Sequence, residues 1–387
     1  MFPYIIFMSL IALSSGILNT WKNFSTPAFT PVLLNLAVIC AAIFLAPYFN
    51  PPIYALTVGV IVGGLLQLGW QIPALMKIGM LPHISFDLMS ALRDAQVRKI
   101  LKLMLPATLA VSVAQISLII NTNWAASLGN GAVSWISYAD RLMEFPTGML
   151  GVALGTILLP SLTRAHASGD VLEYKKLLNW GLRLTLLLAL PAAVGLGVLA
   201  VPLTSTLFQH GRFTAVDVQK TAQALTMYSF GLLGLISVKI LASAYYAKQD
   251  ILTPVLIGIG VLIATQLMNL LFVPYLQHAG LSLSIGLGAC LNAAILVFLL
   301  SRRGMLGGGR DWLGFIVKTS TAVLVMAVVA YFASQQVDWL SMNNGITALI
   351  KRAALLFAVI AASAVVYFAV LFALGFRMRD FRLVSHA

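Results

Sequence analysis

Charged residues are scarce in this sequence. Only 9% of the 387 residues are charged, and Asp and Glu together number 11. A soluble protein carries about a quarter charged residues, so the composition excludes an ordinary soluble enzyme. Cysteine is scarcer still: Cys40 and Cys290 each lie in an apolar run, where a thiol packs as a small hydrophobic residue. We therefore expect neither a disulfide framework nor a cysteine metal site.

Catalytic motifs are missing as well. The sequence contains no DxD, HExxH, GxSxG, Walker or CxxC pattern. A membrane-embedded glycosyltransferase or acyltransferase, the remote alternative, would need catalytic carboxylates or a His–Asp pair in a loop, and none stands out. We expect no enzyme activity, no cofactor and no metal.

Apolar residues make up 60% of the chain, and the mean hydropathy is +0.96. They form runs of about 20 residues, long enough to cross a bilayer core about 30 Å thick. The sequence therefore predicts an all-α polytopic membrane protein with about eleven transmembrane helices. The predicted spans are 3–21, 31–49, 53–76, 103–121, 132–160, 180–208, 222–247, 251–273, 280–300, 312–333 and 350–375.

The basic residues are distributed unevenly between the loops. With residues near the ends of spans counted with the adjoining loop, seventeen of the 24 lie in odd-numbered loops or the C-terminal tail, four lie in even-numbered loops, and Arg141, Lys239 and Lys318 lie deeper within spans. Cytoplasmic loops carry the excess of Lys and Arg, so we predict that the odd loops and the C-terminus are cytoplasmic. The net charge of +13 thus reflects membrane topology and does not indicate binding to nucleic acid.

An internal repeat organises the spans. TPVLLNL at 30–36 resembles TPVLIGI at 253–259, and KIGML at 77–81 resembles RRGML at 302–306. These offsets carry the first span onto the seventh, so the unit is six helices in parallel repeats. Spans 4 to 9 form one unit, and spans 1 to 3 match the second half of another, so we expect three further helices before them. The predicted domains are 1–80, half of a first lobe; 98–305, the second lobe; and 306–387, two extra helices and a basic tail.

The stretch SYADRLMEFPTG at 137–148 contradicts the apolar trend. It places Asp140, Arg141 and Glu144 inside the fifth span, and these two carboxylates are the acidic residues that the predicted spans contain. Arg or Asp at the centre of a membrane helix costs roughly 2.5–3.5 kcal/mol. Such residues face a partner or a water-filled cavity.

Two interpretations of this cluster stay open. Arg141 and Glu144, three residues apart, neighbour each other on a helix and would neutralise each other. Alternatively, Arg141 binds an anion, since guanidinium pairs bidentately with phosphate; Ser134 falls on the same side of the helix. Pro146 predicts a kink, whose freed carbonyl groups could meet polar groups.

Other polar residues within spans predict packing or cavity contacts. Gln266 and Asn269 lie one turn apart, which favours hydrogen bonds between helices. Lys239 either points into a cavity or extends toward the cytoplasm. Asp170, in the polar segment HASGD, is a candidate helix cap.

Three segments resemble one family. ADRLMEFPTGMLGVALGTILLPSLTRAHASGD at 139–170, LFQHGRFTAVD at 207–217 and NTWKNFSTPAFTPVLLNL at 19–36 are similar to the MviN/MurJ family, lipid II flippases of bacterial peptidoglycan synthesis. The resemblance implies a multi-pass protein of the bacterial inner membrane with a fourteen-helix, two-lobe fold of the multidrug/oligosaccharidyl-lipid/polysaccharide exporter superfamily. The spans here would be helices 4 to 14, lacking the first three.

The resemblance also implies a function and a site. Lipid II, a lipid-linked diphosphate, would be carried from the inner to the outer leaflet by alternating access, with membrane lipids and an unidentified coupling ion as partners. Arg141 matches the arginine of the family's cationic cavity, and Asp140, Glu144 and Ser134 match its polar neighbours. Because the family's other cavity arginines lie on its first two helices, the resemblance implies that transport also needs those helices. The alternative is a polysaccharide-lipid or drug exporter of the same superfamily.

Overall fold

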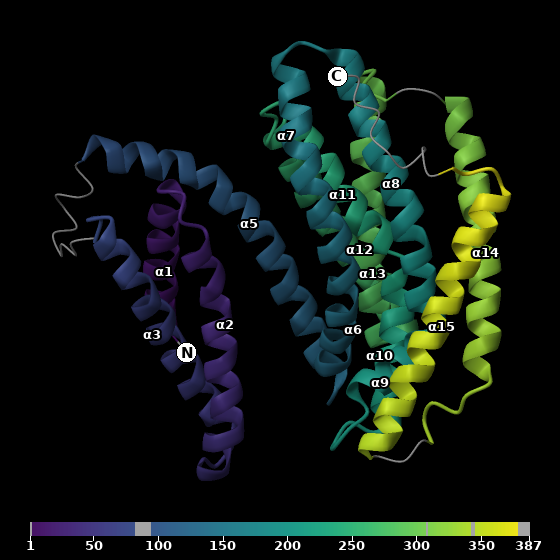
Figure 1. Cartoon of the computed structure of the whole chain (residues 1–387), viewed down its shortest axis with the longest axis horizontal. Coiled ribbons are helices and arrows are strands. Elements are labelled where there is room, and N and C mark those ends of the chain that lie inside the picture. Colours follow the sequence, from purple (N-terminus) through teal and green to yellow (C-terminus); the bar gives the residue numbers. More distant parts are fainter. Residues whose placement is uncertain (1, 82–93, 307–308, 342–344, 378–387) are drawn as a thin grey trace. The chain divides into compact units, whose positions relative to one another are not determined.

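The computed structural model describes residues 2–81, 94–306, 309–341 and 345–377; the side chains of parts of α5 also lie outside the description. Within these ranges every regular element is helical. The chain divides into two compact units, Met1–Leu101 and Lys102–Ala387. Figure 1 shows both as bundles of long helices.

In its described residues the first unit contains three complete helices and the first turns of α5 (Ala95–Ser127). The complete helices are α1 (Pro3–Thr20), α2 (Ser25–Cys40), which continues through η1 (Ala41–Leu45) and η2 (Ala46–Tyr48), and α3 (Ile53–Lys77). Amide side chains of α3 tie them together: Gln67 Nε2 donates to the Thr30 carbonyl at 2.9 Å, and Gln71 Nε2 donates to Ser15 Oγ at 2.9 Å. Inside a bilayer such polar groups need a protein partner, so α3 forms the centre of this unit.

The second unit begins within α5 (Ala95–Ser127) and contains a continuous run of helices. They are α6 (Ala132–Pro146), η3 (Thr147–Val152), α7 (Ala153–Ala167), α8 (Val171–Val198), α9 (Ala200–Phe208), α10 (Ala215–Ser229), α11 (Leu232–Tyr246), α12 (Leu252–Leu276), α13 (His278–Arg302), α14 (Gly309–Gln335) and α15 (Ile346–Ala373).

The core of this unit lies between α6, α7, α8, α10, α11 and α13, where Leu158, Leu225 and Ile236 are fully buried. Glycine permits the closest packing. A Cβ atom placed on Gly231 would lie 2.1 Å from the Cα of Gly286, so α13 and the junction of α10 with α11 meet backbone to backbone.

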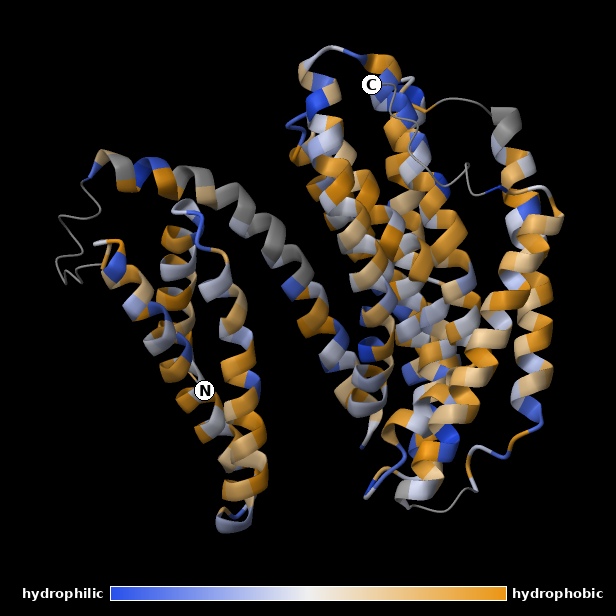
Figure 2. Cartoon of the chain, in the orientation of Figure 1, coloured by the Kyte–Doolittle hydropathy of each residue, from blue (hydrophilic) through white to orange (hydrophobic). Residues whose placement is uncertain are grey.

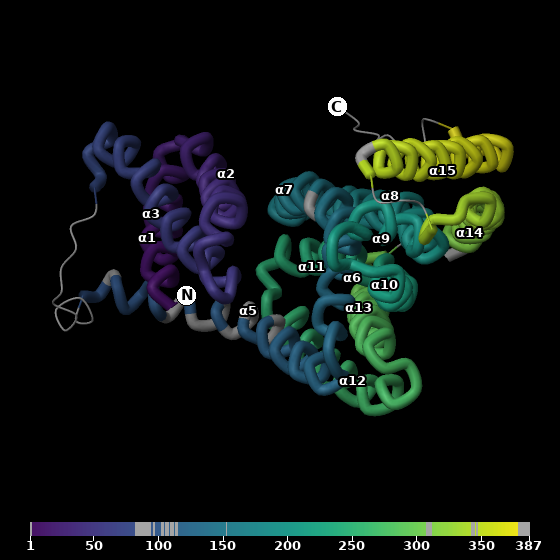
Figure 3. The backbone as a smooth tube through the Cα atoms, turned by 90° about the horizontal axis from the view of Figure 1, so that it is seen from below, coloured from purple at the N-terminus to yellow at the C-terminus, as the bar shows by residue number. Residues whose placement is uncertain are grey.

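The two last helices pack together and against α8 (Figure 3). Tyr367 of α15 donates from its hydroxyl to the carbonyl of Leu187 at 2.6 Å, and a small cluster including Leu187, Met326 and Tyr367 fills the space between the helices. This contact fixes α14 and α15 to the second unit.

The structure agrees with most of the predicted spans. In the described residues nine helical runs are long and apolar enough to cross a membrane, and the pair α10 and α11, bent by 45°, makes up to ten. The predicted span 103–121 lies in α5, partly outside the described side chains. Figure 2 shows apolar residues along the helices and hydrophilic ones at their ends.

The main difference from the predicted spans lies in α8. The sequence predicted a span from 180, which leaves 161–179 as a loop. The helix instead begins at Val171, and its first turns carry Lys175 and Lys176. These polar turns extend the helix beyond its apolar segment. The Asp170 side chain accepts a hydrogen bond from the Glu173 backbone N–H at 2.8 Å, which confirms it as the cap.

Candidate functional site

The charged stretch lies where one transmembrane run changes its winding. α6 ends at Pro146 and continues as the π-helix η3 before α7 begins. Proline has no N–H, so the carbonyl group four residues earlier loses its helical partner. Wider π turns are often found at functional sites. The sequence predicted a kink at Pro146, and the structure shows a π-helix that begins at the next residue.

Arg141 and Glu144 form an ion pair on the exposed side of α6. Arg141 Nη1 lies 3.2 Å from Glu144 Oε2, and the two side chains are 75% and 61% exposed. The pairing that the spacing predicted is therefore present. Yet guanidinium has five N–H donors in a planar fork, and with three quarters of its surface open the Arg141 side chain can also reach a ligand.

Asp140 is separated from this pair by its orientation. Its side chain is half-buried and interacts with the hydroxyl of Tyr228 on α10, whereas Arg141 beside it in sequence is exposed. Adjacent residues differ by 100° around a helix, so one turns toward the bundle while the other turns away. The structure thus does not bring Asp140 onto the same exposed side as Arg141.

Lys239 reaches the same run from α11. Its Nζ donates to the carbonyl of Thr147 at 3.3 Å. The stem of Lys239 lies against Gly151, where a Cβ would come within 2.7 Å of its Cδ. Glycine there leaves room for the lysine, and the amine contacts the first residue of the π-helix. The structure therefore places Lys239 of α11 against η3, the π-helix that follows the Arg141–Glu144 pair along the same run.

Ser134 lies two turns before Arg141 and is exposed on α6. Between them the ring of Tyr138 packs against those of Phe208, tilted at 47°, and Phe213, edge to face, with ring centroids 4.7 and 5.1 Å apart. These aromatic contacts fix the beginning of α6 against the end of α9. Ser134, Arg141, Glu144 and Lys239 together are called the α6 face below.

Sequence reasoning missed three residues. Tyr228 and Thr147 contact predicted residues, and Asn121 of α5 accepts hydrogen bonds from Asn269 at 2.9 Å and Gln266 at 3.4 Å. The predicted interhelical role of Gln266 and Asn269 is confirmed, but their partner was not identified. The feature of the sequence that could have identified Asn121 is its polar side chain at the end of an apolar run.

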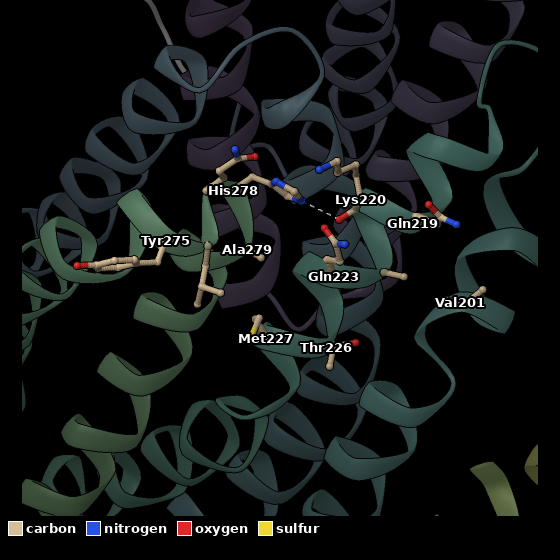
Figure 4. Close-up of a pocket in the computed structure, with 12 residues that line it drawn as sticks. Val201, Gln219, Lys220, Gln223, Thr226, Met227, Tyr275, His278 and Ala279 are labelled. Atoms are coloured by element: carbon tan, nitrogen blue, oxygen red, sulfur yellow. Dashed lines mark hydrogen bonds between the residues drawn. The ribbon is translucent and has the colours of Figure 1, made fainter. Parts of the chain in front are cut away.

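A separate cavity of about 600 Å³ opens where α9, α10 and the turn between α12 and α13 meet (Figure 4). His278 borders it, with Nε2 lying 2.9 Å from the Lys220 carbonyl. Its ring packs on Trp135, whose Nε1 donates to Asp217 at 2.8 Å. These contacts tie α6, α10 and α13 together at one end, and we assign this cavity no ligand.

A metal site does not emerge from the part of the chain that the structure describes. Among those residues no group of three or more His, Cys, Asp or Glu side chains could hold an ion.

Comparison with known proteins matches the chain to lipid II flippases. A family model described as "Lipid II flippase MurJ" matches residues 1–374. The chain is 54% identical over 382 residues to Lipid II flippase MurJ of Burkholderia cenocepacia, covering 99% of this chain and 73% of that protein. It is 39% identical over 383 residues to Probable lipid II flippase MurJ of Haemophilus influenzae, covering 97% of this chain and 73% of that protein.

Solved structures share the fold. Lipid II flippase MurJ in an inward closed conformation matches with a TM-score of 0.75 and 22% identity, over 96% of this chain and 73% of that one. An inward-facing MATE family transporter of the MOP superfamily matches with a TM-score of 0.60 and 17% identity, over 77% of this chain and 68% of that one. At these identities the likeness establishes the architecture, a helical transporter fold.

Proposed function

The chain belongs to the lipid II flippase MurJ family, and from that premise we propose that its α6 face binds the diphosphate of lipid II while the lipid crosses the membrane. The family consists of transporters and not of enzymes. The polyprenyl tail would stay in the lipid phase, and the charged head group would pass along the helices.

Arg141 is the observation that carries this proposal. A guanidinium inside a transmembrane helix costs roughly 2.5–3.5 kcal/mol, and an i,i+3 pair with Glu144 recovers only a few tenths of a kcal/mol. The 75% exposed side chain instead suits an anion that arrives and leaves. Charge-assisted bidentate contacts between Arg and phosphate are about twice as strong as neutral hydrogen bonds.

Lys239 and Glu144 have supporting roles in this mechanism. Lys239 donates to a neutral backbone carbonyl, that of Thr147, and a phosphate oxygen would be the stronger acceptor. Glu144 holds the Arg141 guanidinium in the empty protein. When the diphosphate binds, Lys239 and Arg141 exchange these contacts for contacts with phosphate oxygens. Both cations are therefore paired in the empty protein and in the substrate-bound protein.

A complementation experiment tests the role of Arg141. In a bacterium depleted of its own lipid II flippase, Arg141→Ala in the full-length context, with the three further helices that the repeat predicts, should abolish complementation while the protein level stays normal. Arg141→Lys should rescue poorly, because an ammonium lacks the planar guanidinium fork. The double variant Arg141→Met with Glu144→Leu removes both charges; if it supports growth, Arg141 merely neutralises Glu144 and the proposal is wrong.

The membrane potential supplies the driving force in this proposal. Lipid II carries roughly two negative charges, and each elementary charge that crosses the membrane is worth about 2.3 kcal/mol per 100 mV. Export toward the positive outside is therefore favoured, and the empty cationic site returns inward in the favoured direction. Dissipating the potential while ATP and the pH gradient are held constant should stop export; undiminished export would exclude this mechanism.

The proposed orientation places the C-terminus and the turn after α7 in the cytoplasm. Tags near Arg98 and at the C-terminus should report the cytoplasm, and a tag near Gly129 should report the outside. Equal accessibility of the tags near Arg98 and Gly129 would contradict this topology.

A further inference from the structure

The first unit contains a cavity of its own. It measures about 730 Å³ and lies between α2 and α3. We call it the α2–α3 groove. Its lining is apolar along most of its length and polar at one end, and it consists of Asn23, Thr26, Leu33, Leu65, Leu66, Gly69, Trp70, Pro73, Ala74, Lys77 and Ile78.

The apolar part of the groove is exposed on a transmembrane helix. Leu65, Leu66 and Trp70 are 52%, 48% and 49% exposed, and all three lie in the span Ile53–Lys77. Trp70 is held by Phe29 of α2, with ring centroids 5.2 Å apart. Exposed apolar surface at membrane depth contacts acyl chains, and tryptophan favours the depth of the headgroups.

The polar end of the groove is cationic. Residues 1–81 contain no Asp or Glu, and their two basic residues are Lys22 and Lys77. Both lysines lie at the same end, since Lys22 follows α1 and Lys77 ends α3, and these helices run in the same direction. The N-terminus of α2, which begins at Ser25, adds its partial positive charge there.

Asn23 completes this end as a donor. Its Oδ1 accepts from the backbone N–H and the hydroxyl of Thr26, at 3.4 and 3.1 Å. The amide nitrogen of Asn23 is the half of the side chain that suits an anionic ligand. Of the two lysines, Lys77 lines the groove itself. Together with the Asn23 amide and the N-terminus of α2, it matches the single negative charge of a phosphodiester.

The internal repeat places the same kind of surface on the second unit. KIGML aligns with RRGML, so Lys77 corresponds to Arg302, Pro73 to Phe298 and, through the TPVL motifs, Leu33 to Leu256. Leu256 and Phe298 are 65% and 55% exposed. Arg302 is exposed too, its guanidinium 5.0 Å from the centroid of the Phe298 ring. The repeat-related helices α3 and α13 therefore each end in a cation, Lys77 or Arg302, beside an exposed apolar surface.

We propose that the α2–α3 groove binds one anionic phospholipid of the bilayer, with an acyl chain along Leu65, Leu66 and Trp70 and the phosphate at Lys77. A lysine is a compact point charge suited to a single phosphate, whereas planar bidentate recognition favours arginine. The groove shares no residue with the α6 face. Binding of a phospholipid there does not depend on the proposed transport.

Quenching of Trp70 by brominated lipids tests the proposal. The whole chain is reconstituted in vesicles of dioleoylphosphatidylcholine that contain either dibrominated phosphatidylglycerol or dibrominated phosphatidylcholine. The Trp70 signal is the difference between the parent and Trp70→Phe. We expect half-quenching at about fivefold less brominated phosphatidylglycerol than phosphatidylcholine, as one lysine at an anionic headgroup predicts.

Three variants define the site. Lys77→Gln should remove the preference for phosphatidylglycerol, whereas Lys176→Gln, the same charge change on α8, should leave it intact. Gly69→Leu should lower quenching by both lipids, because a Cβ at Gly69 meets no atom within 4 Å and the new side chain fills the groove without strain.

Several results would overturn the proposal. Equal quenching by the two lipids would remove the anionic preference, and an equal loss in Lys176→Gln would assign it to the general charge of the protein. Trp70 inaccessible to either lipid would mean that a protein segment covers the groove. In each case the role of Arg141 in transport would stand unaffected.

Discussion

The two units differ in the charge that they carry inside the membrane. In the first, residues 1–81 have no acidic side chain, and the buried polar groups of α3 are the amides Gln67 and Gln71. In the second, α6 places Arg141 and Glu144 within a span and leaves both exposed. Amides that bond to neighbouring helices serve packing. Charges that stay exposed at membrane depth indicate function.

The two units also differ in how closely their helices approach each other at glycine. In the first unit a Cβ on Gly63 of α3 would come within 2.6 Å of the Leu34 side chain and 3.1 Å of its Cα. In the second unit Gly231 faces the backbone of Gly286. A flexible side chain can move aside, whereas a backbone cannot without shifting a helix. The second unit should therefore be the less tolerant of added atoms.

The largest expected effect breaks that backbone contact. Gly231→Ala places a methyl group 2.1 Å from the Cα of Gly286, and overpacking of this kind costs about 3 kcal/mol or more. Thermal unfolding in detergent should show a much lower midpoint, or the protein should fail to accumulate. Gly69→Ala, where a Cβ meets open space, is the control and should melt as the parent does. Equal stability of the two variants would refute the contrast.

An intermediate effect compares two tyrosine hydroxyl groups. Tyr367→Phe removes the 2.6 Å hydrogen bond from α15 to the Leu187 carbonyl and leaves a buried acceptor, at a cost of about 1–2 kcal/mol. Tyr4→Phe removes a 3.3 Å hydrogen bond to Gln67 in the first unit and should cost about 0.5 kcal/mol. Reversible unfolding of both variants measures the difference. A larger loss for Tyr4→Phe would reverse the expected order.

The sequence predicted the helices better than the contacts between them. Length and apolar composition are local properties, so the predicted run 53–76 matches α3 to within one residue and the run 251–273 matches α12 to within three. The bend between Ser229 and Leu232 was missed; it lies where Gly231 meets Gly286, and a contact between residues so far apart in the chain leaves no periodic pattern in the sequence.

The candidate site shows the same limit. The pairing of Arg141 with Glu144 could be predicted from their spacing alone, because residues three positions apart on a helix are neighbours on its surface. The contact from Lys239 to Thr147 spans 92 positions, and no periodic pattern encodes it. The orientation of Asp140 toward Tyr228 likewise depends on where α10 lies.

The smallest expected effect concerns an ion pair outside the spans. Burial raises the pKa of Asp250, but hydrogen bonds from Arg303, at 2.9 Å, and from Thr253 outweigh it, so the pKa lies below its ordinary value. A depressed pKa stabilises the fold above the unfolded value, about 4, and this contribution is lost as the pH falls through the folded value.

Asp250→Asn should therefore cost at most about 1 kcal/mol at pH 7, since the Arg303 side chain is 45% exposed and solvent screens the pair. Below about pH 4 the variant and the parent should converge in stability. Unfolding midpoints measured from pH 3 to pH 8 test this. A difference that grows toward acid pH would contradict the assigned direction.

Direct binding of a diphosphate to the α6 face is the most decisive measurement. Farnesyl diphosphate, a short polyprenyl diphosphate, is titrated onto the detergent-solubilised protein, with farnesol as the neutral control. We predict that Arg141→Ala weakens binding of the diphosphate at least tenfold, as loss of a charge-assisted hydrogen bond worth about 1.5–3 kcal/mol requires, while Lys176→Gln changes it little. If Arg141→Ala binds farnesyl diphosphate as tightly as the parent, the charged pair on α6 is not the site at which the head group is held.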